Sequence, residues 1–211
     1  LANDVTFGTV ELTVDTAGKR GDESGFNGAK PKQWGYSAAQ DLQGTYYNFI
    51  GSNGGQFQDA DGSFVFSSPE SVAAFQYIVD LINKYKVSPA ASNTNDNGDF
   101  TRDQFLQGKI ALFQSRLYTL TKGYDRAKSE WGLAPLPAGP KGAVSVVNSV
   151  IVSGNAKSKS PDATTKVLQW LGSGEGAKFI GSSGAAMPAV TSAQSAFNDY
   201  WKSEQVDPSQ F

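Results

Sequence analysis

The chain has 211 residues, of which 39% are hydrophobic and 12% aromatic, which is the composition of a folded globular protein rather than a disordered one. A formal net charge of −2 without a basic cluster excludes the positively charged surface that nucleic-acid binding needs. Histidine and cysteine are both absent, which excludes a Ser-His-Asp triad, a thiolate metal site, most zinc chemistry and a disulfide framework.

The N-terminal residues, LAND, resemble the middle of a helix and form no signal peptide. No apolar run approaches the ~20 residues that span a bilayer. We therefore expect a fragment of a longer protein whose targeting segment lies elsewhere, folded as one domain.

Residues 13–31 are dense in Gly, Asp, Asn and Ser and lack an apolar period, which predicts a loop. Four of its side chains could offer oxygen ligands to calcium: Asp15, Asp22, Glu23 and Asn27. Their spacing does not match the EF-hand loop, so a solvated loop is the preferred interpretation.

A short strand is predicted over residues 32–36, and a helix over 40–50 that stops at a glycine pair. Tyr46 and Tyr47 lie in this helix and belong either to the core or to a ligand site, because a tyrosine hydroxyl needs a polar partner. Asp41 and Gln43, just before them, are plausible acceptors for hydroxyl groups.

Residues 56–66 predict a hairpin around an Asp-Gly turn. A long amphipathic helix should follow over 68–85, because Ser68 can cap it and Pro69 suits its first turn. The expected buried stripe has helical spacing and consists of Val72, Phe75, Ile78 or Val79, Ile82 and Tyr85.

Residues 99–120 read as helix, strand, helix. Gly108 can end the first helix with a left-handed backbone, and the apolar run 109–113 predicts a buried strand. A strand that runs into a helix places its polar corner at the carboxyl edge of a sheet, where open α/β domains bind ligands. Ser115, Arg116 and Tyr118 are therefore candidate site residues.

Prolines predict an extended segment over 131–140, and the apolar run 144–152 predicts another strand. Asn148 interrupts this run and must be hydrogen-bonded if it is buried, most simply to the backbone. Further helices are expected over 160–171, 175–180 and 193–201.

Several ordered motifs resemble those of the extracellular solute-binding proteins that serve sugar ABC importers. They are F-x-x-G-K-x-A-[LM] at Phe105–Leu112, an S-P-E helix start at 68–81, and W-G-x-x-P-L-P-x-G-P at 131–140. The resemblance implies an α/β fold, namely a class II periplasmic-binding-protein-like lobe with a mixed sheet and helices on both faces. Residues 1–211 would form a single lobe, with 148–184 as the crossover segment to a missing lobe.

The same resemblance implies that the protein binds a sugar or oligosaccharide by closing two lobes around it, without a cofactor or a reaction. Its partner would be the membrane permease of an ABC importer. It would be extracellular, either as a membrane-tethered lipoprotein or in the periplasm.

The site residues follow from the matched positions. Tyr118 stands where the family has a Trp that stacks on the sugar, and Arg116 departs from the usual glycine. Met187 lies in a turn similar to one that returns the chain toward the cleft. The expected ligand-binding set is Tyr118, Tyr46, Tyr47, Asp41, Gln43, Ser115, Arg116, Asn148 and Met187.

Two other functions are possible for such a sequence. A glycosidase or lyase would need paired carboxylates, for which Asp41 and Asp99 are the candidates. A carbohydrate-binding module is disfavoured, because such modules are usually β-sandwiches and this chain has many predicted helices. As a fragment, the chain would expose apolar residues of 146–151 and 167–171 and could self-associate.

Overall fold

We analysed a computed structural model, which describes residues 10–38, 42–95, 99–115, 119, 127–128 and 130–210. The chain divides into two compact units. The first comprises residues 1–115, 125–131 and 135–147, and the second comprises 116–124, 132–134 and 148–211. This division does not test the crossover predicted over 148–184, which stays a prediction.

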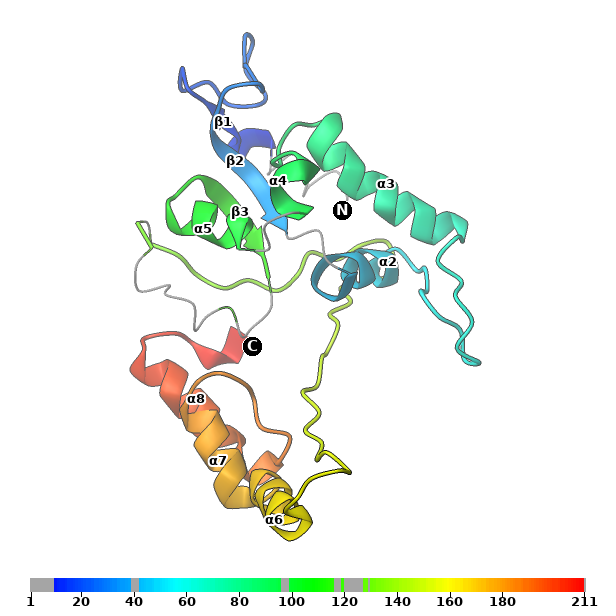
Figure 1. The fold of residues 1–211 in the computed structure, drawn as a ribbon. Coiled ribbons are helices and arrows are strands. Elements are labelled where there is room, and N and C mark those ends of the chain that lie inside the picture. The colour runs from blue at the N-terminus through cyan, green and yellow to red at the C-terminus, as the bar shows by residue number, and fades with distance from the viewer. Residues whose placement is uncertain are drawn as a thin grey trace. The chain divides into compact units, whose positions relative to one another are not determined.

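The first unit contains a three-stranded mixed sheet in the order β1-β2-β3 (Figure 1). Strand β1 (Val14–Asp15) pairs antiparallel with β2 (Pro31–Ala38), and β2 pairs in parallel with β3 (Ile110–Gln114). The strands predicted at 32–36 and 109–113 are confirmed as β2 and β3, and so is the mixed sheet.

Helices cover both faces of β2. The Ser37 hydroxyl lies 3.3 Å from the Thr101 hydroxyl of α5 (Phe100–Leu106). The neighbouring Tyr36 lines a small cavity with Ile78 and Ile82 of α3 (Pro69–Asn83), and Ser37 borders the same cavity. Figure 1 shows α5 and α3 on opposite sides of β2 and β3, as predicted.

The helix predicted over 40–50 has an unusual beginning. Its first turn is π-helical (Leu42–Tyr46) and continues into α2 (Tyr47–Ser52). Gly54 follows with a φ of 86°, a left-handed conformation that glycine adopts without steric cost. Single π-helical turns are frequent at functional sites, so this turn is a candidate part of one.

Helix α3 begins as predicted, because the Ser68 side chain accepts a hydrogen bond from the N–H of Ser71 at 3.2 Å. The predicted stripe is wrong in part, since Val72 and Val79 are exposed. The buried positions are Ser71, Ala74, Ile78 and Leu81. At the first of these, α3 packs closely on Gly55, because a Cβ on Gly55 would lie only 2.5 Å from the Ser71 hydroxyl oxygen.

The hairpin predicted over 56–66 is present, with a single bridge between Gln58 and Phe64. The rings of Phe57 and Phe66 stack with their centroids 5.3 Å apart. Helix α4 (Ala91–Asn95) then precedes α5, which Gly108 ends with a φ of 70°.

The strand predicted over 144–152 is wrong, because these residues have no regular secondary structure. Val147, Val150 and Ile151 are 89%, 87% and 88% exposed. An apolar run becomes a strand only when another strand offers its edge, and no described strand pairs with this one.

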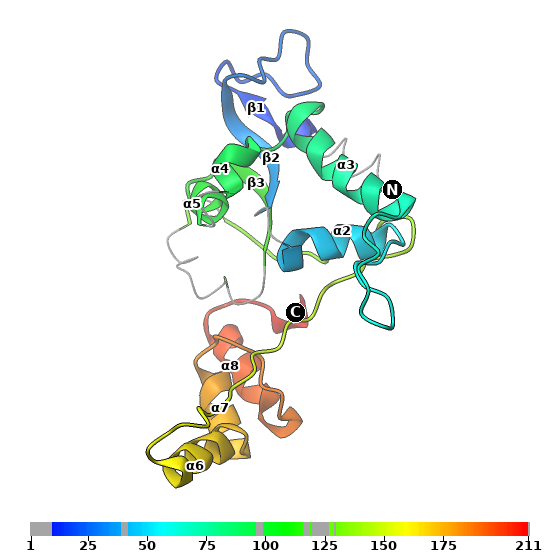
Figure 2. The ribbon, with the colours of Figure 1, turned by 45° about the vertical axis from the view of Figure 1, so that its right-hand side comes forward.

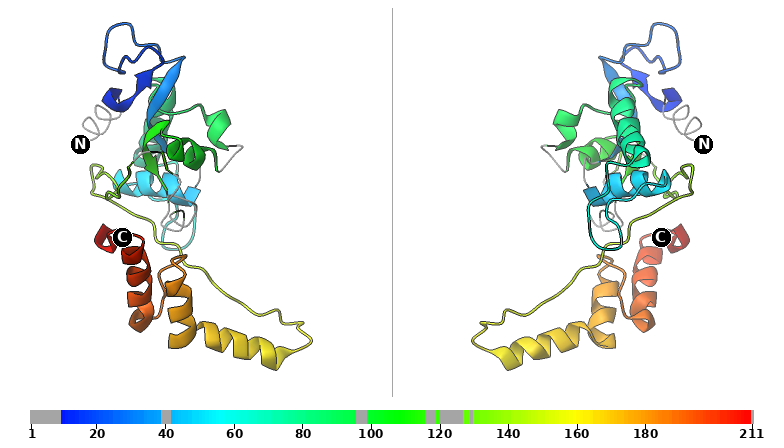
Figure 3. Two further views of the ribbon diagram at one scale, coloured as in Figure 1. Left: turned by 90° about the vertical axis from the view of Figure 1, so that its left-hand side faces the viewer. Right: turned by 90° about the vertical axis from the view of Figure 1, so that its right-hand side faces the viewer.

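The second unit consists mainly of helices, and Figures 2 and 3 show them in three further orientations. They are α6 (Pro161–Leu171), α7 (Gly174–Ser182), a 3₁₀ turn (Thr191–Ala193), α8 (Gln194–Ser203) and a final 3₁₀ turn (Pro208–Gln210). The three predicted helices are confirmed. Phe197 and Trp201 of α8 are buried with Ala177 of α7, whereas α6 buries none of its residues.

Candidate functional site

The carboxyl ends of the parallel pair β2 and β3 are joined to the start of the 42–52 helix by one side chain. The Tyr36 hydroxyl donates to Gln114 Oε1 at 2.8 Å, and Gln114 Nε2 donates to the Gly44 carbonyl at 2.9 Å. Gln43 precedes Gly44 and Ser115 follows Gln114, so two predicted site residues from distant segments lie near each other. Both are exposed.

A second amide reaches the same carbonyl. Asn48 Nδ2 donates to the Gly44 carbonyl at 2.9 Å, while Asn48 Oδ1 accepts from the backbone N–H of Val146 at 2.8 Å. The Ser52 hydroxyl accepts from the N–H of Val144 at 3.0 Å. The helix therefore holds residues 144–146, near the end of the last part of the first unit.

The orientation of the Gln114 amide follows from its two partners. Burial raises the pKa of the Tyr36 phenol, and the nearby Tyr77 phenol raises it further, so Tyr36 keeps its proton. The Gly44 carbonyl can only accept a hydrogen bond. Rotating the amide by half a turn would place Oε1 against that carbonyl, so only one orientation satisfies both partners.

The two candidate tyrosines are half-buried, and each has an aromatic neighbour. The Tyr46 ring centroid lies 5.1 Å from that of Phe75, and the Tyr47 ring meets Phe57 edge-on at 4.7 Å. Both rings therefore contribute to packing and retain exposed surface. Their role in ligand binding stays a prediction.

Asp41, Arg116 and Tyr118 lie outside the described residues. Asn148 and Met187 belong to the second unit, and both are exposed. Their roles in ligand binding also stay predictions. Gln114 and Asn48 were missed by the sequence analysis, although a polar residue closing an apolar strand could have pointed to Gln114.

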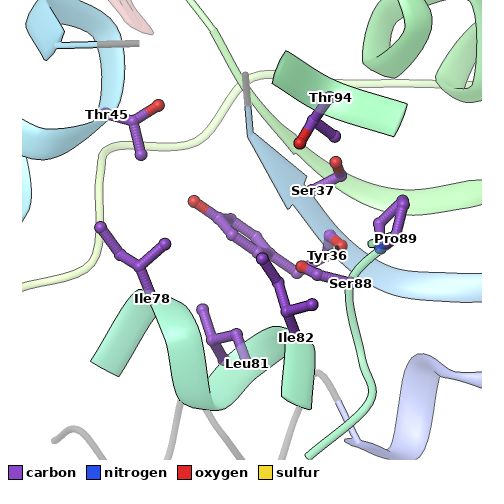
Figure 4. Close-up of a pocket in the computed structure, with 9 residues that line it drawn as sticks. All are labelled: Tyr36, Ser37, Thr45, Ile78, Leu81, Ile82, Ser88, Pro89 and Thr94. Carbon is purple, nitrogen blue, oxygen red and sulfur yellow. Dashed lines mark hydrogen bonds between the residues drawn. The ribbon is translucent and has the colours of Figure 1, made fainter. Parts of the chain in front are cut away.

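A small cavity between β2, α3 and α4 is not this site. Its volume of about 10 Å³ holds one water molecule at most, so a sugar does not fit. Figure 4 shows the Tyr36 ring reaching from β2 toward the side chains of α3. The lining residues are Tyr36, Ser37, Thr45, Ile78, Leu81, Ile82, Ser88, Pro89 and Thr94.

The loop over 13–31, for which a solvated loop was preferred to a calcium site, is organised by the carboxylate of Asp15. Asp15 Oδ1 accepts from the N–H groups of Ala17 and Lys19, and Oδ2 accepts from that of Asn27. These hydrogen bonds lower the pKa of Asp15, and the bond from the N–H of Asn27 has the largest effect. Within the described ranges no three acidic side chains gather as metal ligands.

Of the two carboxylates that a glycosidase or lyase would need, Asp41 lies outside the described residues and Asp99 lies at the start of α5. Asp99 is exposed and lies 2.7 Å from the Arg102 guanidinium, one turn further along α5. Asp103 lies 2.9 Å from the same guanidinium. Asp99 is thus part of a surface ion-pair group.

Comparison with known proteins identifies the family. The model of the bacterial extracellular solute-binding proteins matches residues 11–178. A binding protein of Brucella abortus is 28% identical over 130 residues, which is 60% of this chain and 31% of that protein. Across the part of the chain that the structure describes, no helix has both the length and the apolar character needed to cross a membrane.

Three solved structures share the fold. UspC of M. tuberculosis is 49% identical, with a TM-score of 0.82, over 98% of this chain and 51% of UspC. The maltodextrin-binding domain MalE of Bdellovibrio bacteriovorus, bound to maltotriose, is 19% identical with a TM-score of 0.68, over 97% of this chain and 54% of that one. An ABC transporter solute-binding protein of Thermotoga lettingae, bound to α-D-tagatose, is 20% identical with a TM-score of 0.59. The match covers 83% of this chain and 48% of that one.

The chain thus spans about a third of the curated relative and about half of each solved structure. The family match nevertheless covers most of its length. These matches agree with the mixed sheet and with helices on both of its faces. The chain belongs to the family of bacterial extracellular solute-binding proteins.

Proposed function

We propose that this chain is part of a protein that binds a sugar or oligosaccharide and delivers it to the permease of an ABC importer, by closure of two lobes around the ligand. One observation carries the proposal. Gln114 brings the exposed Gln43 and Ser115 together at the carboxyl end of a parallel strand pair, beside a helix that bears two half-buried tyrosines. Amides and hydroxyls that bind sugar hydroxyls, next to aromatic rings that stack on sugar faces, suit this ligand class.

The remaining predictions belong to the same proposal. Residues 1–211 would form one lobe, with 148–184 as the crossover segment. The protein would carry out no reaction on the sugar. Its place would be outside the cytoplasmic membrane, as a tethered lipoprotein or in the periplasm. Maltotriose and α-D-tagatose, the ligands of two structures with this fold, are suitable first probes.

A thermal-shift screen of the full-length protein tests the proposal. A sugar that binds the folded state raises the melting temperature, by an amount that grows with its concentration. Gln43→Ala should weaken this response without changing the melting temperature of the free protein, because the side chain is exposed. Gln107→Ala, an exposed glutamine at the end of α5, is the matched control.

The same incubation separates binding from catalysis. The proposal predicts that maltotriose is recovered intact. Cleavage products would favour a glycosidase, and the absence of any shift across mono- and oligosaccharides would contradict sugar binding.

A further inference from the structure

We propose that Gln114 is a positioning residue for the ligand site, which holds the start of the 42–52 helix against the carboxyl end of β3. The inference rests on the proposed function. Gln114 need not touch the sugar. Its side chain would set the distance between the helix residues Gln43 and Tyr46 and the strand-end residue Ser115.

The side chain of Gln114 connects three elements through two hydrogen bonds. Strand β2 supplies the Tyr36 hydroxyl, strand β3 supplies the amide, and the helix supplies the Gly44 carbonyl, with donor–acceptor distances of 2.8 and 2.9 Å. The two partners lie 78 and 70 residues from Gln114 in sequence. Strands β2 and β3 are also paired through their backbones, with Tyr36 opposite Leu112 and Ala38 opposite Gln114, so the sheet side of the connection is held independently of the side chains.

On the helix side, Gln114 binds the first turn. The turn that contains Gly44 is π-helical. Two side-chain amides, from Gln114 and Asn48, donate to the Gly44 carbonyl. Asn48 belongs to the same helix, so of these two only Gln114 ties the turn to the sheet.

Two substitutions remove different parts of this connection. Gln114→Leu has a similar size and removes both hydrogen bonds. Tyr36→Phe removes only the hydroxyl that orients the amide and leaves the bond to Gly44 available. Gln76→Leu is the matched control, because Gln76 also donates one side-chain hydrogen bond, to Asp80 at 2.8 Å, but on the exposed face of α3.

Hydrogen–deuterium exchange of the sugar-free full-length protein is the first measurement. Gln114→Leu should increase exchange of the amides of 42–48 about tenfold, and Tyr36→Phe should do so less. Gln76→Leu should leave this segment unchanged. Equal exchange in Gln114→Leu and the wild type would overturn the proposal, even if the wild type binds no sugar.

Calorimetric titration at 25 °C is the second measurement, with maltotriose and α-D-tagatose as probes. Gln114→Leu should weaken by about tenfold the affinity for whichever probe the wild type binds, since loss of a hydrogen bond at a site is worth about this factor. A residue with a purely structural role would lower the melting temperature without changing the affinity of the folded protein. If Gln114→Leu does not fold, Gln114→Glu, which keeps the acceptor for Tyr36 and loses the donor to Gly44, takes its place in both measurements.

The two failures are distinguishable. A wild-type protein that binds neither these probes nor any other sugar contradicts the proposed function, while the exchange data still decide whether Gln114 holds the helix. A wild-type protein that binds a probe, with an affinity that Gln114→Leu leaves within twofold, contradicts the positioning role alone.

Discussion

Asn48 accepts a hydrogen bond from the backbone N–H of Val146, 98 residues further along the chain, at 2.8 Å. The same side chain donates to Gly44, so one amide joins the helix that carries the candidate tyrosines to the segment that ends the first unit. Residues 144–147 form no strand. The side chains of Ser52 and Asn48 instead accept hydrogen bonds from the backbone of this segment and hold it in place.

Replacing Asn48 should release that segment. Asn48→Ala removes both hydrogen bonds of a nearly buried side chain and should lower the free energy of unfolding by about 1–3 kcal/mol. Urea denaturation measures the loss, and limited proteolysis should show faster cleavage within 144–150. Asn93→Ala, an exposed asparagine of α4, should change neither quantity. Equal cleavage of both variants would show that Asn48 does not hold the segment.

The Asp15 loop predicts a pH dependence of stability. The Asp15 pKa lies below its ordinary value of 3.8, chiefly because the N–H of Asn27 donates to the carboxylate. A carboxylate with a lower pKa in the folded state stabilises the protein above its unfolded pKa. This contribution is lost as the pH falls below 3.8 and through the lower folded value.

Asp15→Asn should therefore destabilise the protein at pH 7 more than at pH 2. The new amide would place a donor against the N–H of Asn27. Denaturation curves recorded between pH 2 and 7 measure the effect, with the exposed Asp22→Asn as control. A loss of stability that does not vary with pH would contradict the assignment.

Two Ser-Pro helix starts provide an internal test of capping. Ser68 accepts the N–H of Ser71, whereas the side chain of Ser160, at the start of α6, makes no such bond. Ser68→Ala should cost about 1 kcal/mol of stability, and Ser160→Ala should cost close to nothing. Thermal denaturation compares the two directly, and equal effects would rule out the difference in capping.

Tyr118, which lies outside the described residues, remains the main sequence prediction for the site. Tyr118→Ala should weaken sugar binding by about 1–3 kcal/mol and leave the melting temperature nearly unchanged. Tyr85→Ala, just after α3, should not change sugar affinity. If Tyr118 belongs to the core, its loss should instead cost roughly 3–5 kcal/mol of stability, which calorimetry would detect.

The exposed apolar residues predict that the 211-residue chain, expressed by itself, self-associates. Val150 and Ile151 are exposed, and α6 buries none of its residues, which leaves apolar surface available to a second copy. Light scattering over a range of concentrations measures the association. The double substitution Val150→Ser and Ile151→Ser should reduce it, whereas Val72→Ser, on the exposed face of α3, should not. A monomer at every concentration would contradict this prediction.

The sequence alone determined the elements whose signals are local. Ser68 and Pro69 mark the start of α3, Gly108 marks the end of α5, and the short apolar run after it forms β3, because caps, glycine conformations and periodicity act within a few residues. The sequence also placed Ser115 directly after this strand, and its role in ligand binding stays a prediction.

Only the tertiary structure decided which distant residues complete that corner. The bond from Gln114 to Gly44 spans 70 residues, and nothing in either local sequence specifies the partner. The run 144–152 has the composition of a strand but forms none, because a strand exists only when another offers its edge, and Asn48 and Ser52 bind the start of the run instead. Pairing between distant segments depends on how the whole unit packs, so it could not be inferred from the periodicity of either segment.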